Sequence, residues 1–276
     1  GGFILAGFPN MPTGGLEDGG REIIIDNGAT TGIRVSRKVY VPSNHAYCRF
    51  LEVVTNLGAS ATNYTVRIDT NLGSDAGTVI VGTSDGDSLF ETIDQWIVTD
   101  DADGSGDPVV THVIAGPGAA QIPSATSTYP IGTISYTYDL SLNPQETKII
   151  MHFGAQGTNR AAALDKAAQI ASLSAAQDCL SGMTSAERSR VVNFTIVGRS
   201  LDVVNPNGEQ WFEPGSVIPI IWASAGSDWQ SGDTVRIEAS SDGGATWAPI
   251  PGAGNLAYDA GSFNWDTTGV VPSDQY

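Results

Sequence analysis

The sequence is short of cysteine, of histidine and of charged side chains. Its 276 residues include two cysteines, three histidines and 16% charged residues. Two cysteines cannot build a disulfide-held scaffold, and they leave open either one bridge between Cys48 and Cys179 or two free core thiols. No run approaches the roughly 20 apolar residues that a membrane span needs. We therefore expect a protein folded around an apolar core, without a membrane span.

Basic residues are the second shortage. Lysine and arginine total 13 against 30 aspartates and glutamates, which gives a net charge of −17. Such an acidic chain repels phosphate backbones, so nucleic-acid binding is excluded. The acid is mostly aspartate, and glycine is abundant at 33 residues. Aspartate and glycine together are typical of tight turns, and aspartate is also typical of cation sites built from oxygen ligands.

What the sequence does contain is a series of short segments in which apolar and polar residues alternate. Residues 33–40 and 64–69 follow this period of two, and residues 49–56 are more continuously apolar. Clusters of Gly, Asn, Asp and Pro separate the segments, with no helical pattern between them. This arrangement predicts an all-β fold whose first domain, residues 1–157, is a large antiparallel β-sandwich.

Helical signals are confined to residues 158–195. Asn159 can cap a helix that begins at Arg160 and is rich in alanine. Thr184 and Glu187 have the spacing of a capping box at the start of a second, shorter helix. We expect these helices to form a connector packed on the large domain.

A recurring pattern of tryptophans, glycines and alternating apolar residues begins near residue 201. It runs through Gly208-Glu209-Gln210-Trp211, Pro214-Gly215-Ser216, Ile220-Ile221-Trp222, Val235-Arg236-Ile237-Glu238 and Gly261-Ser262-Phe263-Asn264-Trp265. The pattern resembles an Ig-like module of large secreted and surface-anchored bacterial and archaeal proteins, sometimes described as Ser-Thr-rich and anchored. The resemblance implies a small Ig-like β-sandwich over residues 196–276, incomplete at its C-terminus.

The first domain carries a weaker resemblance of the same kind. Its segments 37–42, 71–75 and 99–101 are similar to parts of multidomain extracellular bacterial proteins. That likeness implies a secreted or cell-surface location.

The sharpest local signal for a ligand is an aspartate-rich loop at residues 101–107. Oxygen-bearing side chains alternate with small residues there, at Asp101, Asp103, Ser105 and Asp107, and Asp100 can add another ligand. Calcium prefers six to eight hard oxygen ligands, which this spacing supplies in part. The loop lacks the glutamate at position 12 of an EF-hand, so a calcium site and a plain hairpin turn remain the two alternatives. Residues 84–87 form a weaker acidic turn.

A second local pattern occupies residues 240–247. It fits the Asp-box, in which Ser and Asp side chains bond within a hairpin turn above a packed tryptophan. Its residues are Ser240, Asp242, Gly244, Thr246 and Trp247. One copy cannot form a propeller, which needs several blades, so a structural turn is the expected role.

Tryptophans also raise the question of sugar binding, because an exposed indole stacks on a pyranose ring. The four in the Ig-like pattern are expected in the core: Trp211, Trp222, Trp247 and Trp265. Trp229 lies in a polar stretch, residues 226–232, and is the predicted exposed ligand-binding aromatic.

Motifs for catalysis are missing. His45, His112 and His152 are scattered and follow no metal-binding spacing, and there is no nucleophile elbow, P-loop or dinucleotide fingerprint. The sequence therefore predicts a protein that is not an enzyme, with a sandwich-fold lyase or hydrolase as the lesser alternative.

Together these features favour a non-catalytic structural or adhesive module of a cell-surface or filament-forming protein, stabilised by calcium. Its partners would be copies of itself, neighbouring modules or a polysaccharide. The alternative is a carbohydrate-binding accessory region of a secreted glycoside-active enzyme.

Overall fold

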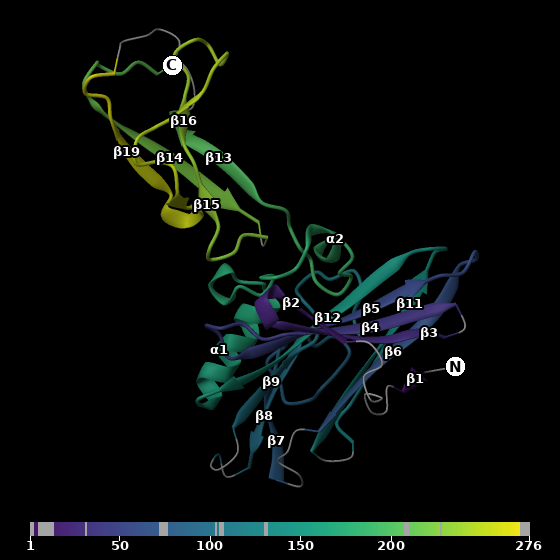
Figure 1. The fold of residues 1–276 in the computed structure, drawn as a ribbon. Coiled ribbons are helices and arrows are strands. Elements are labelled where there is room, and N and C mark those ends of the chain that lie inside the picture. The colour runs from purple at the N-terminus through teal and green to yellow at the C-terminus, as the bar shows by residue number, and fades with distance from the viewer. Residues whose placement is uncertain are drawn as a thin grey trace. The chain divides into compact units, whose positions relative to one another are not determined.

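The computed structural model describes residues 3–4, 14–30, 32–71, 77–102, 104, 108–129, 132–206, 210–226 and 228–270 (Figure 1). The chain divides into two compact units, residues 1–196 and 197–276. Strands dominate both units, which confirms the predicted all-β class.

The first unit contains an eight-stranded sheet in which every pairing is antiparallel. In spatial order its strands are β2 (Gly14–Glu17), β3 (Glu22–Thr30), β4 (Ile33–Tyr40), β5 (Tyr47–Asn56), β12 (Thr147–Gly157), β9 (Val109–Val113), β8 (Trp96–Asp101) and β7 (Thr78–Thr83). A short 3-10 turn, η1 (Asp18–Gly20), joins β2 to β3.

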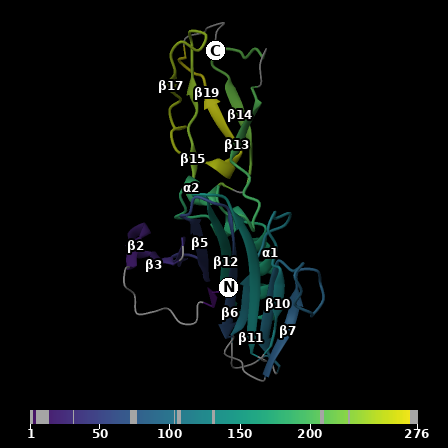
Figure 2. The same cartoon turned by 90° about the vertical axis from the view of Figure 1, so that its right-hand side faces the viewer.

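A four-stranded sheet lies against one face of this larger sheet (Figure 2). Its order is β1 (Phe3–Ile4), β6 (Thr62–Asn71), β11 (Thr133–Leu142) and β10 (Ala125–Ser127). The core between the sheets includes Val54 and Ile150 from the larger sheet and Val66, Tyr138 and Leu140 from the smaller one. We call the covered side of the larger sheet its inner face.

The opposite face of the larger sheet packs against the helical connector. Here α1 (Arg160–Ala171) buries Ala163 and Ala167, and its N-cap Asn159 accepts a hydrogen bond from the Ala162 amide. The turn η3 (Ala175–Gln177) and the helix α2 (Ser185–Arg188) follow, and Thr184 and Glu187 form the predicted capping box. Both helix starts are therefore confirmed. Because β5 and β12 are covered on both faces, their sequences are more continuously apolar than those of half-exposed strands.

The two cysteines are free, and the geometry of β5 explains why. Side chains alternate between the faces of a strand. Arg49, next to Cys48, reaches the backbone carbonyl of Cys179 on the connector side, so Cys48 points to the inner face. The cysteines lie on opposite sides of the sheet, and the bridge left open by the sequence is not formed.

The second unit is built around the sheet β13 (Ser200–Asn205), β14 (Val217–Ala225) and β19 (Ser262–Asp266). Two short pairs complete it, β15 (Thr234–Val235) with β18 (Leu256–Ala257) and β16 (Glu238–Ala239) with β17 (Ala248–Pro249), followed along the chain by the turn η4 (Tyr258–Ala260). Its small core contains Ile218, Ile220, Ile250 and Ala253.

The tryptophans of this unit do not follow the sequence expectation. Trp222 is buried as expected, but Trp211 is 83% exposed and Trp247 is 61% exposed. Trp229, expected at the surface, is only 8% exposed and stacks on Tyr258 with the ring centroids 4.7 Å apart. Its faces are covered by this partner and by Arg199, so the predicted open platform at Trp229 is wrong.

Candidate functional site

Two clusters of charged side chains lie on opposite faces of the larger sheet, and strands β4 and β5 contribute to both. The alternation of side chains separates them, so neighbours such as Arg37 and Lys38 point to opposite faces. Residues facing the helical connector form one cluster, the connector-side network: Glu17, Glu22, Lys38, Arg49 and Glu187. Residues on the inner face form the other, the inner-face relay: Arg37, Glu52, His152 and Tyr136.

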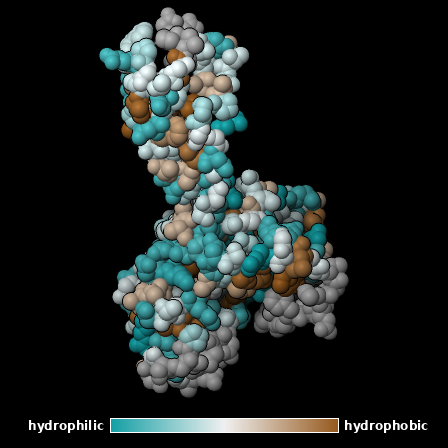
Figure 3. All heavy atoms as spheres, turned by 60° about the vertical axis from the view of Figure 1, so that its left-hand side comes forward, coloured by the Kyte–Doolittle hydropathy of each residue, from teal (hydrophilic) through white to brown (hydrophobic). Residues whose placement is uncertain are grey.

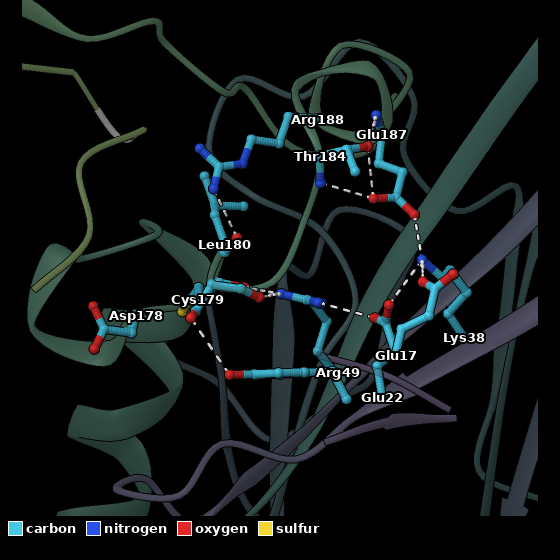
Figure 4. A network of polar contacts seen from close by, with 12 residues as sticks. Glu17, Glu22, Lys38, Arg49, Asp178, Cys179, Leu180, Thr184, Glu187 and Arg188 are labelled. Carbon is cyan, nitrogen blue, oxygen red and sulfur yellow. Dashed lines mark hydrogen bonds and ion pairs between the residues drawn. The ribbon is translucent and has the colours of Figure 1, made fainter. Parts of the chain in front are cut away.

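The connector-side network is closed by direct ion pairs (Figure 4). The Lys38 Nζ lies 2.7 Å from Glu17 Oε2, 2.8 Å from Glu22 Oε2 and 2.6 Å from Glu187 Oε1. Burial alone would lower the pKa of Lys38, but hydrogen bonds to these carboxylates raise it. The ammonium therefore stays charged and ties α2 to the sheet.

Arg49 makes the second half of this network. It is fully buried and pairs with Glu22 at 3.1 Å. It also donates to the backbone carbonyls of Cys179, at 3.0 Å, and Ser181, at 2.6 Å, and its guanidinium lies over the Tyr40 ring. Every contact joins the sheet to itself or to the connector, which makes this network a structural clamp.

The inner-face relay is a line of contacts that crosses from one sheet to the other. Arg37 Nε donates to Glu52 Oε1 at 2.6 Å, and His152 Nε2 lies 3.1 Å from the same oxygen. On the other side of the imidazole, Nδ1 lies 2.9 Å from the Tyr136 hydroxyl. Glu52 and His152 belong to the larger sheet, whereas Tyr136 comes from β11 of the smaller one.

Protonation states within the relay follow from burial and from these partners. Burial alone would raise the pKa of Glu52, but the hydrogen bond from His152 and the charge of Arg37 hold it below its usual value. Burial lowers the pKa of His152 in spite of Glu52, and burial raises the pKa of Tyr136 well above its usual value. At neutral pH the relay holds a carboxylate, a neutral imidazole and a phenol. His152 Nε2 then donates to Glu52, and Nδ1 accepts from Tyr136.

The inner face becomes steadily more exposed away from the relay. One row runs directly across the strands in register, from Leu16 through Ile23, Val39 and Phe50 to His152. Leu16 is 70% exposed and Ile23 43% exposed, Val39 and Phe50 are half-buried, and His152 is buried. The relay thus lies where the sealed core meets an open apolar face.

Two buried polar atoms at this place have no hydrogen-bond partner among the described residues: Glu52 Oε2 and His112 Nε2. His112 pairs in register with Gly154, two positions beyond His152, so it shares the inner face. Burial, with a contribution from His152, lowers the pKa of His112 to about 4. A buried carboxylate oxygen with no partner among the described residues is free to accept a hydrogen bond from a ligand hydroxyl or from water.

Sequence reasoning missed the relay, because its four members are far apart in the chain and match no motif. Two of them sit among apolar neighbours in their strands: Glu52 between Leu51 and Val53, and His152 between Met151 and Phe153. A polar residue at an inward position of an apolar strand was the available signal.

The predicted calcium loop is described only in part. Asp103, Ser105 and Asp107 lie outside the described residues. Asp100 is buried at the end of β8 and accepts from Arg160 Nε at 2.5 Å, while the Arg160 guanidinium also donates to the Asp101 carbonyl. In the weaker acidic turn, side-chain oxygens of Asp85, Asp87 and Glu91 lie within 4.8 Å of one another, and all three residues are exposed.

The residues of the Asp-box pattern bond to one another within their turn. Ser240 Oγ donates to Asp242 at 2.7 Å, and Thr246 donates to Asp242 from both its amide, at 2.8 Å, and its hydroxyl, at 2.6 Å. The Gly244 amide donates to Ser240 Oγ at 2.8 Å. Trp247 contacts this turn, since its Nε1 donates to the Gly244 carbonyl at 3.1 Å, but the residue is 61% exposed and not part of the core, which corrects that part of the expectation.

No family model and no curated protein matches the sequence. Solved structures that match parts of this chain include a polysaccharide lyase (13% identity, TM-score 0.36), which matches 92% of this chain over 32% of its own length. A galactose mutarotase-like protein from Lactobacillus casei (8% identity, TM-score 0.35) matches 51% of this chain over 71% of its own. A protein from Escherichia coli K12 described as an aldose 1-epimerase (12%, TM-score 0.32) matches 51% over 67%. The chain thus spans about a third of the lyase.

These neighbours are β-rich, sandwich-like proteins. Their names, a polysaccharide lyase and aldose epimerase-like proteins, contradict the expectation that the chain is not an enzyme, and that expectation is withdrawn. Within the described residues, no helix is both long and apolar enough to cross a membrane.

Proposed function

We propose that this chain acts on carbohydrate and that the inner-face relay transfers protons at a bound sugar. One observation carries the proposal: a buried carboxylate with one unpartnered oxygen is oriented by a guanidinium, an imidazole and a phenol beside a half-exposed face. In acid–base sites a second side chain commonly holds the base in place, and a third side chain orients the second.

The proposed roles follow from the hydrogen bonds. Glu52 Oε1 is occupied by Arg37 and His152, which leaves Oε2 to accept the proton of a sugar hydroxyl. His152 supports the carboxylate through Nε2, and Tyr136 fixes the imidazole tautomer by donating to Nδ1. Phe50 stacks on His152 with the ring centroids 4.9 Å apart and lies next in the row toward the open face.

Elimination, hydrolysis and ring opening of sugars all require a proton to be taken from one oxygen or carbon and given to another. The test uses the purified full chain with neutral polysaccharides, uronate polysaccharides and free aldoses. Three readouts separate the reactions: new ultraviolet absorbance for elimination, new reducing ends for hydrolysis, and optical rotation for mutarotation.

Glu52→Gln keeps the shape of the side chain and removes its charge, so we expect kcat to fall by roughly 10²–10⁴-fold. Tyr136→Phe should lower kcat less, because it frees the imidazole tautomer without removing the base. Tyr138→Phe is the matched control: Tyr138 lies two residues away on β11, is equally buried, and donates to the Ile114 carbonyl outside the relay. The proposal fails if the wild type turns over none of the substrates, or if Glu52→Gln retains the wild-type kcat.

We further propose that the protein works outside the cell and binds calcium at residues 101–107. The acidic composition and the aspartate-rich turns support both ideas. Added calcium should raise the melting temperature of the wild type and have no effect on Asp103→Ala. Equal melting curves with calcium and with chelator would remove the metal from the proposal.

A further inference from the structure

We propose that the second unit carries a separate carbohydrate-binding surface formed by Trp211 and Trp247, with neutral polysaccharide as its ligand. The inference goes beyond the proposed function, because none of its residues belongs to the inner-face relay. It starts from an asymmetry within one small unit. Trp222 and Trp229 are buried, whereas the large rings of Trp211 and Trp247 are left in solvent.

Two tryptophans with such large exposed fractions point to a function at the surface, because burial of an aromatic ring is among the largest stabilising contributions available to a fold. Phe212 is also partly exposed next to Trp211. Figure 3 shows the visible side of the second unit as a mixture of hydrophilic and hydrophobic residues, without one continuous hydrophobic area. Isolated aromatic rings with polar surroundings suit a sugar, whose ring has an apolar face and a rim of hydroxyls.

Both tryptophans lie at the same end of the unit. This is the end at which β14 begins and β19 finishes, where the Ser216 carbonyl accepts a hydrogen bond from the Thr267 hydroxyl. Trp211 precedes β14 in the chain. At the other end of β14, Trp222 Nε1 donates to Tyr258, and the Tyr258 amide donates to the Asp233 carbonyl. The chain runs away from that end through β15 and β16, which carries the turn at residues 240–247 toward the Trp211 end (Figure 1).

One hydrogen bond orients the ring of Trp247. Its Nε1 donates to the Gly244 carbonyl at 3.1 Å, and the Gly244 amide donates to Ser240 Oγ. The internal bonds of the turn therefore satisfy the one polar atom of the indole and leave the ring exposed. A ring that is oriented before binding loses less conformational entropy when a ligand stacks on it.

Charge identifies the class of sugar. Between residues 200 and 276 there is one basic residue, Arg236, against ten aspartates and glutamates. Arg236 is paired with Glu238 at 3.1 Å. With Glu213 and Asp242 close in sequence to the two tryptophans, a uronate or sulfated polysaccharide would be repelled, and a neutral glucan or xylan would not.

The experiment is affinity electrophoresis of the full chain in gels that contain a soluble neutral glucan, a xylan or polygalacturonate. We expect retardation by a neutral polysaccharide and none by polygalacturonate. Trp211→Ala and Trp247→Ala should each weaken binding by about tenfold or more, as loss of a central aromatic contact does. Phe at either position should restore part of the binding. Val217→Ala is the matched control, because Val217 is 57% exposed and apolar in the same unit.

Melting temperatures should match the wild type in all these variants, since the rings contribute little to the core. Three results would overturn the inference. They are unchanged retardation of the double alanine variant, retardation by polygalacturonate alone, and no retardation by any neutral polysaccharide. A fourth would be a loss of self-association in the tryptophan variants, measured by sedimentation velocity, without an effect on sugar, because it would assign the surface to protein contact. Glu52→Gln distinguishes the two sites: it should lower kcat by roughly 10²–10⁴-fold and leave retardation intact.

Discussion

The two faces of strands β4 and β5 carry similar charged residues, which make different contacts. On the connector side, Lys38 and Arg49 meet the carboxylates of Glu17, Glu22 and Glu187 directly. On the inner face, Glu52 keeps one oxygen without a partner beside an open apolar row. The comparison teaches that burial of charge alone does not indicate a functional site. Both networks contain buried polar atoms without a hydrogen-bond partner, but Glu22 Oε2 has its ion pair with Lys38 and Arg49 Nε is a donor. The informative feature is therefore a carboxylate oxygen that has neither a hydrogen bond nor an ion pair.

The largest expected effect comes from breaking the clamp. Arg49→Ala leaves Glu22 buried beside Lys38 alone and removes the donors to the Cys179 and Ser181 carbonyls. Removal of one partner of a buried ion pair costs about 3–5 kcal/mol. The free energy of unfolding, measured by urea denaturation followed by circular dichroism, should fall by about that amount.

Arg34→Ala is the control for this experiment, because the Arg34 pair with Asp26 lies at the surface, where ion pairs contribute at most about 1 kcal/mol. Equal losses in the two variants would show that the connector-side network is not a clamp.

The next effect concerns the inner face and depends on pH. The pKa of His112 is about 4 in the folded protein, below the value of about 6.5 for an unfolded histidine. The folded state therefore binds fewer protons, and stability is lost as the pH falls from about 6.5 toward 4. The loss should be about 2–3 kcal/mol.

His112→Asn should reduce the dependence of the unfolding free energy on pH over this range. Arg49→Ala should lower the unfolding free energy by a similar amount at each pH and leave that dependence unchanged. Equal slopes for the wild type and His112→Asn between pH 6.5 and pH 4.5 would contradict the assignment.

The smallest effect is expected at the start of α2, the helix that the Lys38–Glu187 ion pair joins to the sheet. Thr184→Ala removes the cap of α2 while leaving the Lys38 pairs in place, so it should cost about 1 kcal/mol. Thr184→Ser keeps the hydroxyl and should restore most of the stability. A loss as large as that of Arg49→Ala would mean that the cap, and not the ion pairs, holds the connector.

The parts of the fold that depend on local sequence could be predicted. The alternation in β4 and β6, the Asn159 cap and the Thr184–Glu187 capping box are all set by residues within a few positions of each other. The relay could not be predicted, because the register of β4, β5 and β12 and the packing of β11 bring residues 37, 52, 136 and 152 together. The exposure of Trp211, Trp229 and Trp247 was also misjudged, because packing between distant segments decides it.

The ion pair between Lys38 and Glu187 has a consequence for synthesis of the protein. Its partners are 149 positions apart in sequence. At roughly 5–20 residues per second, the ribosome adds Glu187 about 7–30 s after Lys38. During that interval the first strands carry a basic group that lacks one of its final carboxylates and an apolar face without its helices. The nascent chain should therefore be open to chaperones and proteases until the connector emerges.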